Sequence, residues 1–524
     1  MDRRQFRTIA PLSPPVMKWL EIALVALVFF VVAAWPVPDV NEPHYLGKAK
    51  HYWQPSWGAG DFFLESRDAH LVFYWLFGWV TQFLSLTATA WVGRILAWSL
   101  LAWAWWRLSF ALVPRPLVSV LTAALVALGI ERLNLAGEWM IGGIEAKPLA
   151  YVLVLLGAEA LVRGRWNRTW LLLGGASAIH VLVGGWSVVM TGIAWLTGRE
   201  KRPRLVPMLP YLVGGLLLSL PGLVPALMFS RGVPADVVRQ ANMNYVYNRL
   251  PHHLALHTLP VEEMWTRYIR HGLLVAALAL LCYAVPAGAR HRRFRRFIWA
   301  AVGIAAVGLV FAYATRGLPE MAAGVLRYYW FRMTDVAVPI GVAITAARGL
   351  SLLSWQRPRL AVAGTAALVM VSGWYLGSIV LERHEDPRPR ADRRMADYAA
   401  WLDVTDWVAE HIPPGSRFVT PRMAHTFTWR TGLPQVVSNK DIPQDAPSIV
   451  EWQERIDTIY RYVAEGETHT WDSLSEMGEA RLETLGARYD ADYVLTEHKR
   501  PLRLPLLYAN GTYAVYRING ADDP

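Results

Sequence analysis

The sequence is poor in cysteine and in charged residues. Its single cysteine, Cys282, lies within an apolar run, so no intramolecular disulfide can form and cysteine usage does not indicate a redox compartment. Charged residues make up 18% of the 524 residues, whereas hydrophobic residues make up 54% and the mean hydropathy is +0.24. This balance excludes a soluble protein of this size and indicates a polytopic membrane protein.

Long apolar runs are abundant, among them Trp19–Pro36, Leu205–Phe229 and Leu360–Leu381. Each has about the 17–25 residues that a helix needs to cross the hydrocarbon core, and we expect about 10–12 spans in all. The runs stop near residue 381. The expected fold class is therefore a polytopic α-helical membrane domain over residues 1–381, followed by a water-exposed tail.

The net charge of +11 is concentrated in short loops between apolar runs. This distribution follows the positive-inside rule and gives no support for nucleic acid as a partner. The basic loops are Arg163–Arg168, Gly198–Arg204, Arg290–Arg296 and Gln356–Arg359. The first apolar run follows Arg3, Arg4, Arg7 and Lys18 and lacks a small-x-small cleavage site, which predicts an uncleaved signal anchor with a cytosolic N-terminus. The loop 39–70 and the tail are then external.

Two stretches complicate the count of spans. Counting forward through spans at about 71–87 and 90–112 places Arg163–Arg168 outside, whereas the later basic loops place it inside, so one span between 70 and 160 is wrongly drawn. The run from Thr169 to Leu196 contains two Gly-Gly pairs with His180 between them, which predicts two short broken helices that line a cavity.

Residues 382–394 read as a proline- and arginine-rich linker, and residues 395–524 as a small external α/β domain. The pattern predicts helices at Met395–His411 and near 447–464 and 473–486. Strands are expected at Arg417–Thr420, Gln435–Ser438, Asp492–Glu497 and Thr512–Ile518. No GxGxxG or P-loop motif supports nucleotide binding.

The loop 39–70 carries an unusual mixture of acids, histidines and aromatics beside a bilayer. If its start is helical, Asp39, Glu42 and His44 lie within about one turn, and partial desolvation would make a carboxylate there a better general base. Further polar residues lie just before the next apolar run and could come close to the first group in space: Asp61, Glu65, Asp68 and His70. The alternative is a set of ordinary interfacial polar residues.

Other polar residues leave alternatives open. Glu138, Glu145 and Lys147 are costly to bury and indicate either a structural ion pair or a functional group. His180 is either a cavity residue or a packed core residue. His252, His253 and His257, with His44, could bind a divalent metal, although adjacent histidines rarely point at one ion.

The first external loop contains Asn41-Glu42-Pro43-His44-Tyr45, and the next apolar run opens on the aromatics Phe73-Tyr74-Trp75. These motifs resemble the membrane glycosyltransferases of the C superfamily, which include protein mannosyltransferases and the aminoarabinose and oligosaccharyl transferases. The first external loop of those enzymes often reads Asp-Glu followed by an aromatic pair, so asparagine stands here at the usual catalytic aspartate. Arg67-Asp68-Ala69-His70 likewise stands where relatives carry a Pro-Pro pair, whereas WVAEHIPPGSRFVT (Trp407–Thr420) agrees with their tails. A little-characterised bacterial subgroup is indicated by Arg249–His253, Arg327–Asp335 and Pro443–Trp452.

The resemblance implies a polyprenyl-phosphate-linked sugar as donor, an acceptor on the external face, and a location in the bacterial inner membrane with a periplasmic tail. The catalytic role would move to Glu42 or Asp39, with Asp68 as a further candidate. Arginine binds phosphate bidentately, so Arg327, Arg332 and Arg249 are the expected donor-phosphate ligands. Arginines that snorkel from an interfacial aromatic belt are the alternative for Arg327 and Arg332.

Further cavity candidates are His44, Asp61, His70, Glu145, His180, His252 and His253. Two other functions are compatible with the sequence. One is a catalytically silent structural or assembly subunit of a membrane protein complex, favoured by Asn41; the other is a transporter, favoured by the broken helices around His180.

Overall fold

The computed structural model describes residues 14–198 and 203–518, so Arg3, Arg4 and Arg7 lie outside the described residues. Within them, seven helices are long and apolar enough to cross a membrane. They are α1 (Pro14–Ala33), α5 (Leu86–Leu112), α10 (Leu205–Met228), α13 (Val261–Ala284), α14 (Ala289–Ala314), α16 (Arg332–Gln356) and α17 (Pro358–Glu385). The chain is a multi-pass helical membrane protein, as predicted.

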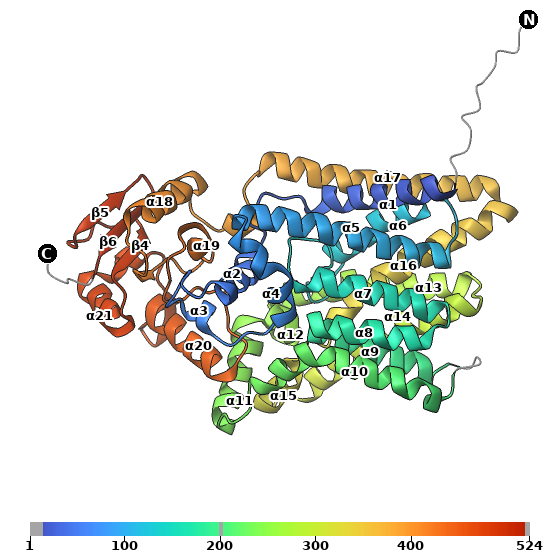
Figure 1. Ribbon diagram of the computed structural model, residues 1–524, viewed down its shortest axis with the longest axis horizontal. Helices are drawn as coiled ribbons and strands as arrows, with labels where there is room; N and C mark the ends of the chain where they lie inside the picture. Colours follow the sequence, from blue (N-terminus) through green and yellow to red (C-terminus); the bar gives the residue numbers. More distant parts are fainter. Residues whose placement is uncertain (1–13, 199–202, 519–524) are drawn as a thin grey trace, which may run out of the picture.

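Shorter helices pack among these spans, side by side in the bundle of Figure 1. They are α6 (Val118–Arg132), α7 (Ala146–Val162), α8 (Trp166–Ile179) and α9 (Val181–Leu196). The predicted break at His180 is confirmed, because α8 ends at Ile179 and the extended backbone of His180 (φ −145°, ψ 102°) starts α9.

Two of the basic loops lie at the same end of the bundle. Arg290 donates to the carbonyl of Ala111 at 3.3 Å and Arg293 to that of Val162 at 3.2 Å, so the ends of α5 and α7 lie beside the start of α14. The loop Arg163–Arg168 therefore lies at the same end as Arg290–Arg296, which resolves the conflict in the span count.

The expected span at 71–87 is wrong. It forms α4 (Leu71–Phe77) and the 3₁₀ turn η1 (Gly78–Gln82), both too short to cross, and both pack on α2 (Glu42–Trp53). Trp53 donates to the carbonyl of Tyr74 at 2.8 Å, which holds the two segments together. The apolar character of this run suggested a span, but aromatic side chains such as those of Leu71–Phe77 are also abundant at the interface between lipid and water.

Smaller elements complete the end of the bundle opposite the basic loops. They are α3 (Phe62–Glu65), α11 (Ala235–Met243), the π-helical turn η2 (Asn244–Arg249), α12 (Pro251–Leu254), η3 (Leu256–Thr258) and α15 (Pro319–Leu326). Asp335 at the start of α16 accepts three backbone N–H groups of the loop between α6 and α7, from Leu135, Ala136 and Glu138, at 2.6–3.0 Å. This buried carboxylate fixes a loop that has no secondary structure of its own.

The tail is an α/β fold, as predicted. Its four-stranded sheet has the order β1-β4-β6-β5, with β1 parallel to β4 and the other pairs antiparallel. The elements are α18 (Tyr398–His411), β1 (Phe418–Val419), α19 (Phe427–Thr431), α20 (Ala446–Tyr460), β2 (Arg461–Ala464), β3 (Glu467–Thr470), η5 (Leu474–Met477), α21 (Glu479–Tyr489), β4 (Tyr493–Glu497), β5 (Leu506–Ala509) and β6 (Tyr513–Arg517). The β2–β3 hairpin and the edge strand β5 were not predicted, and Gln435 contributes only an isolated bridge to Phe418.

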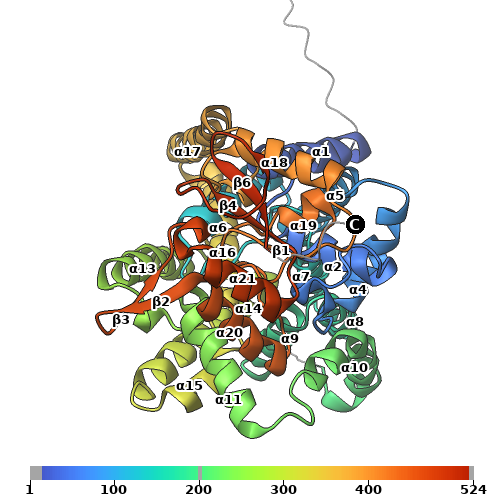
Figure 2. The same cartoon turned by 90° about the vertical axis from the view of Figure 1, so that its left-hand side faces the viewer.

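Alternate residues of the central strands face opposite layers. Tyr493 and Leu495 pack on α18, whereas Val494 packs toward α20 and α21. The second layer continues without a break into α11, η2 and α15 of the bundle. Figure 2 shows the tail lying over this end of the bundle. The tail therefore shares a hydrophobic core with the membrane domain.

The expected linker is ordered. Helix α17 continues to Glu385, and the turn η4 (Arg390–Asp392) follows. The guanidinium groups of Arg390 and Arg393 lie 4.6 and 4.3 Å from the ring centroid of the fully buried Trp35. These cation–π contacts attach the linker to the loop after α1.

Candidate functional site

Glu42 is buried and all of its hydrogen-bonding capacity is engaged. Its Oε1 accepts from Arg94 Nε at 2.7 Å and from the N–H of Ile144 at 2.9 Å, and its Oε2 accepts from Arg94 Nη2 and from the N–H of Asp39, both at 2.7 Å. Glu42 is 1% exposed and Arg94 is fully buried. The carboxylate therefore neutralises a buried guanidinium and ties α2 to α5 and to the loop before α7.

Asp39 has a similar environment. Its Oδ1 accepts from the N–H of Val40 and its Oδ2 from that of Gly143, both at 2.8 Å, and the side chain is fully buried. A β-carbon added at Gly143 would stand 2.7 Å from Asp39 Cβ and 2.8 Å from Glu42 Oε1, so the loop approaches these acids as only glycine allows. Neither acid opens onto a cavity, and a catalytic role for them stays a prediction.

The other expected acids are dispersed. Asp61 caps α3 by accepting from Phe63 and Leu64, and its second oxygen accepts from Thr428 Oγ1 at 3.0 Å. Burial raises the pKa of the Asp61 carboxyl. Asp68 is partly exposed and lies 3.4 Å from the ammonium of Lys48. The structure thus does not gather Asp39, Glu42, Asp61 and Asp68 around one cavity.

A cavity of about 290 Å³ lies at the tail-bearing end, between α4, α9, α10 and the start of α16. One wall is polar and the other is apolar. The polar wall comprises Tyr45, His70, His180, Tyr245, Arg327, Tyr329, Arg332 and Gln444; the apolar wall includes Val181, Leu182, Leu223, Ala226, Leu227 and Phe229. No aspartate or glutamate is among the described residues that line it.

The two arginines of the cavity differ in how their charges are compensated. Arg332 lies 2.7 Å from Glu138, with its guanidinium 3.8 Å from the ring centroid of Tyr329. Arg327 donates to the amide oxygen of Asn242 and forms no ion pair with any residue of 14–198 or 203–518. Arg327 therefore brings an uncompensated positive charge to the cavity.

Glu138 links Arg332 to the second polar island. Lys147 lies 3.8 Å from Glu138 and 3.2 Å from Glu145, and Asn41 donates to Glu145 Oε2 at 2.7 Å. The predicted pairing of Glu145 with Lys147 is present. Asn41, at the position of the family's aspartate, thus orients a buried carboxylate that comes from another loop.

His70 and His180 face each other within the cavity, with ring centroids 5.2 Å apart. His70 Nε2 is 3.3 Å from the hydroxyl of Tyr45, and His180 Nε2 is 3.5 Å from Arg332 Nη1. Burial, reinforced by the field of His44, lowers the pKa of His70 to about 3, so this imidazole is neutral, with one ring nitrogen able to donate a hydrogen bond and the other able to accept one.

The remaining candidates lie outside this cavity. Arg249 donates to the carbonyls of Asn439 and Lys440 in the tail at 2.9 and 3.2 Å, so it holds a tail loop. His44 is 3.3 Å from Asp441 Oδ1 of the same loop.

His252 and His253 are in contact, with ring centroids 4.1 Å apart and ring planes tilted by 45°. Burial lowers the pKa of both imidazoles, to about 4 for His252. Among the described residues, no group of three or more His, Cys, Asp or Glu could hold a metal ion.

An apolar groove of about 240 Å³ adjoins the cavity between α8, α9 and α10. It shares Val181 and Leu223 with the cavity, and small residues open it: Gly174, Ser177, Gly185, Gly215 and Ser219. The sequence predicted that the broken helices over Thr169–Leu196 line a cavity, but sequence reasoning missed the contribution of α10 to this groove and the tyrosines of the other cavity. The glycine and serine spacing along 174–185 and 215–219 was the available signal.

Comparison with known proteins gives limited information. A family described as "Domain of unknown function (DUF6798)" matches residues 399–459. No curated protein matches the chain. The structure is similar to that of ArnT from Cupriavidus metallidurans bound to undecaprenyl phosphate, at 13% identity and a TM-score of 0.34, over 97% of this chain and 99% of that one. At this level of overlap the likeness carries no weight for the chemistry, which rests on the residues of this chain.

Proposed function

We propose that this protein is a membrane glycosyltransferase of the C-superfamily type in the bacterial inner membrane. It would take a sugar from a polyprenyl-phosphate donor and transfer it to an acceptor hydroxyl on the external face. One observation carries the proposal: a cavity with two arginines adjoins an apolar groove between helices, and the two share the lining residues Val181 and Leu223. This combination suits a lipid that has an anionic head and a long hydrocarbon tail.

In the proposed reaction the acceptor oxygen attacks the anomeric carbon of the sugar, and the bond from that carbon to the phosphate oxygen breaks. The leaving phosphate gains negative charge, which Arg327 and Arg332 stabilise. His70 accepts the acceptor proton. A phosphate bound beside Arg332 would offset the positive field of that arginine at His70 and so raise the pKa of the imidazole.

Arg327→Gln tests donor binding, because Arg327 is the cavity arginine without an ion pair among the described residues. Loss of a charge-assisted hydrogen bond should raise the Kd for undecaprenyl phosphate by about 10–100-fold, measured with the full chain in nanodiscs. Arg316→Gln is the matched control, since Arg316 is exposed and lines neither cavity nor groove. Equal affinities for wild type and Arg327→Gln would contradict the proposal.

The second candidate is a catalytically silent subunit on the same fold. The observation in its favour is that the carboxylates of Glu42 and Asp39 are fully engaged and no acid lines the cavity. The two candidates separate when the protein is given a panel of polyprenyl-phosphate hexoses, pentoses and aminosugars. Release of free polyprenyl phosphate supports the enzyme, whereas tight binding without release from any of them supports the silent subunit.

A further inference from the structure

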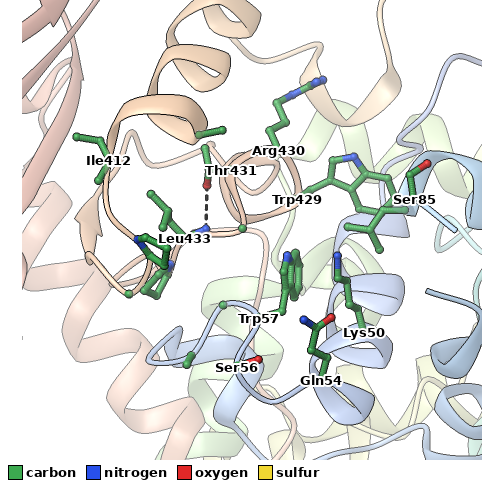
Figure 3. Close-up of a pocket in the computed structure, with 18 of the residues that line it drawn as sticks. Lys50, Gln54, Ser56, Trp57, Ser85, Ile412, Trp429, Arg430, Thr431 and Leu433 are labelled. Carbon is green, nitrogen blue, oxygen red and sulfur yellow. Dashed lines mark hydrogen bonds between the residues drawn. The ribbon is translucent and has the colours of Figure 1, made fainter. Parts of the chain in front are cut away.

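A second, larger hollow lies on the other side of α2. This cleft has a volume of about 490 Å³ and runs between α2 with the loop after it and the tail segment that follows α18. In Figure 3, Lys50, Gln54 and Trp57 lie along one wall, and Trp429, Arg430 and Thr431 along the other.

Several polar groups of the cleft are available to form hydrogen bonds with a ligand. The Lys50 ammonium, the Gln54 amide and the indole N–H groups of Trp57 and Trp429 have no hydrogen-bond partner within residues 14–198 and 203–518. The Lys50 ammonium lies 4.8 Å from the ring centroid of Trp57. Apolar ring faces beside free donors and acceptors match a saccharide, whose C–H faces stack on indoles while its hydroxyls form hydrogen bonds.

The charged residues that line the cleft are all basic. No aspartate or glutamate is among the described residues that line it. Arg430 forms an ion pair with the buried Asp392, so its charge is compensated, but Lys50 has no such partner among the described residues. The cleft therefore offers one free cation to a ligand.

The two walls are held together before any ligand binds. Asp61 Oδ2 accepts from Thr428 Oγ1 at 3.0 Å and from the N–H of Gln435 at 3.1 Å, which joins the loop before α3 to the tail. Gly432 has a positive φ of 72°, and a β-carbon there would stand 3.1 Å from Trp57 Nε1. Gly432 of the tail therefore packs directly against the Trp57 indole.

The cleft borders the membrane surface. Exposed aromatic side chains cluster on α2, α4, η1 and the residues that follow them, at Trp53, Trp75, Trp79 and Phe83. Such a cluster marks the interface between lipid and water. Gln54 and Ser85 of the cleft are next to this cluster in the chain.

We propose that the cleft between α2 and the tail binds an acidic saccharide at the membrane surface, with Trp57 and Trp429 stacking on its rings and Lys50 pairing with its acidic group. Assignment of this saccharide as the acceptor rests on the proposed glycosyltransferase function. Binding of the saccharide does not rest on it.

The test measures binding of trigalacturonate, and of the neutral galactose trisaccharide, to the full chain in nanodiscs. Lys50→Gln should weaken trigalacturonate binding about tenfold and leave the neutral sugar unchanged, because a charge-assisted contact is lost. Trp429→Ala should weaken both ligands about tenfold, because a stacking face is removed. Gln54→Ala, at an exposed position, provides a second cleft variant that cannot disturb the core. Lys499→Gln, an exposed cation of the tail, is the control.

The proposal is overturned if wild type binds neither saccharide, if the cleft variants bind as wild type does, or if Lys499→Gln weakens binding as much as Lys50→Gln. Comparing free trigalacturonate with the same saccharide coupled to a lipid distinguishes a soluble from a membrane-borne ligand. Undecaprenyl phosphate is titrated in parallel. Its failure to bind wild type would defeat the glycosyltransferase function and leave the saccharide site standing.

Discussion

Glu42→Gln distinguishes a structural from a catalytic role of this residue. In wild type the two carboxylate oxygens accept from Arg94 Nε and Nη2 and from the N–H groups of Asp39 and Ile144. A glutamine can accept with only one of its two terminal atoms. In either amide orientation, one donor of Arg94 and one backbone N–H then face an amide NH₂ group, and the buried guanidinium loses its counter-charge.

The magnitude follows from this geometry. Breaking a buried ion pair by removal of one partner costs about 3–5 kcal/mol, a large part of the roughly 5–15 kcal/mol that stabilises a typical fold. Glu42→Gln should therefore lower the thermal unfolding midpoint of the detergent-solubilised protein markedly. The control is Glu263→Gln, which breaks an exposed pair with Arg267 and should cost no more than about 1 kcal/mol.

A double variant strengthens the test. Arg94→Met removes the uncompensated charge, so Glu42→Gln with Arg94→Met should lose less stability than the two single changes added together. A Glu42→Gln protein that melts like wild type and binds undecaprenyl phosphate, yet no longer transfers sugar, would refute the structural role. It would also establish the catalytic role predicted from the sequence.

Two further predictions concern the groove and the tail. Gly185→Leu should weaken binding of undecaprenyl phosphate but not of a short-chain prenyl phosphate. The reason is that a β-carbon at Gly185 meets no protein atom within 4 Å, so the leucine can extend into the groove and block the long hydrocarbon tail. The control is Gly192→Leu, where a β-carbon is equally unhindered but lies outside the groove, and this variant should bind both lipids normally. Burial, and then the charge of Arg249, lower the pKa of Lys440 from 10.5 to about 8. Because the unfolded chain then holds this proton to higher pH, the stability of wild type should rise relative to Lys440→Met between pH 8 and 10.5 in thermal unfolding, and remain at a constant difference below pH 8. A difference that does not change with pH, or that Lys499→Met reproduces, would contradict this assignment.

The candidate site could be predicted only in part. His70 and His180 were identified from residue type and position beside an apolar run, whereas Arg327 and Arg332 were expected from what the family resemblance implies; the structure brings all four to one cavity. Arg249 was identified by the same reasoning, yet it binds backbone carbonyls of the tail. A charged residue at the end of a span has no local feature that distinguishes these two environments.

The acids illustrate the same limit. Glu42 looked catalytic because it stands at the family's motif, but its partners Arg94 and Ile144 are 52 and 102 positions away in the chain. Glu138 acquires its role from Arg332, and Asn41 from Glu145. None of these pairings leaves a periodic or compositional signal.

The sequence by itself determined the membrane class, the break at His180 and the α/β tail. These follow from the length of apolar runs, charge bias and strand or helix periodicity, all of which are local properties of the chain. Tertiary structure alone decided that residues 71–82 pack on α2, that Arg327 has no ion-pair partner among the described residues, and that Trp57 and Trp429 line the same cleft. The physical reason is that burial and pairing depend on which distant segments pack together, and an ionisable group acquires its function only from that environment.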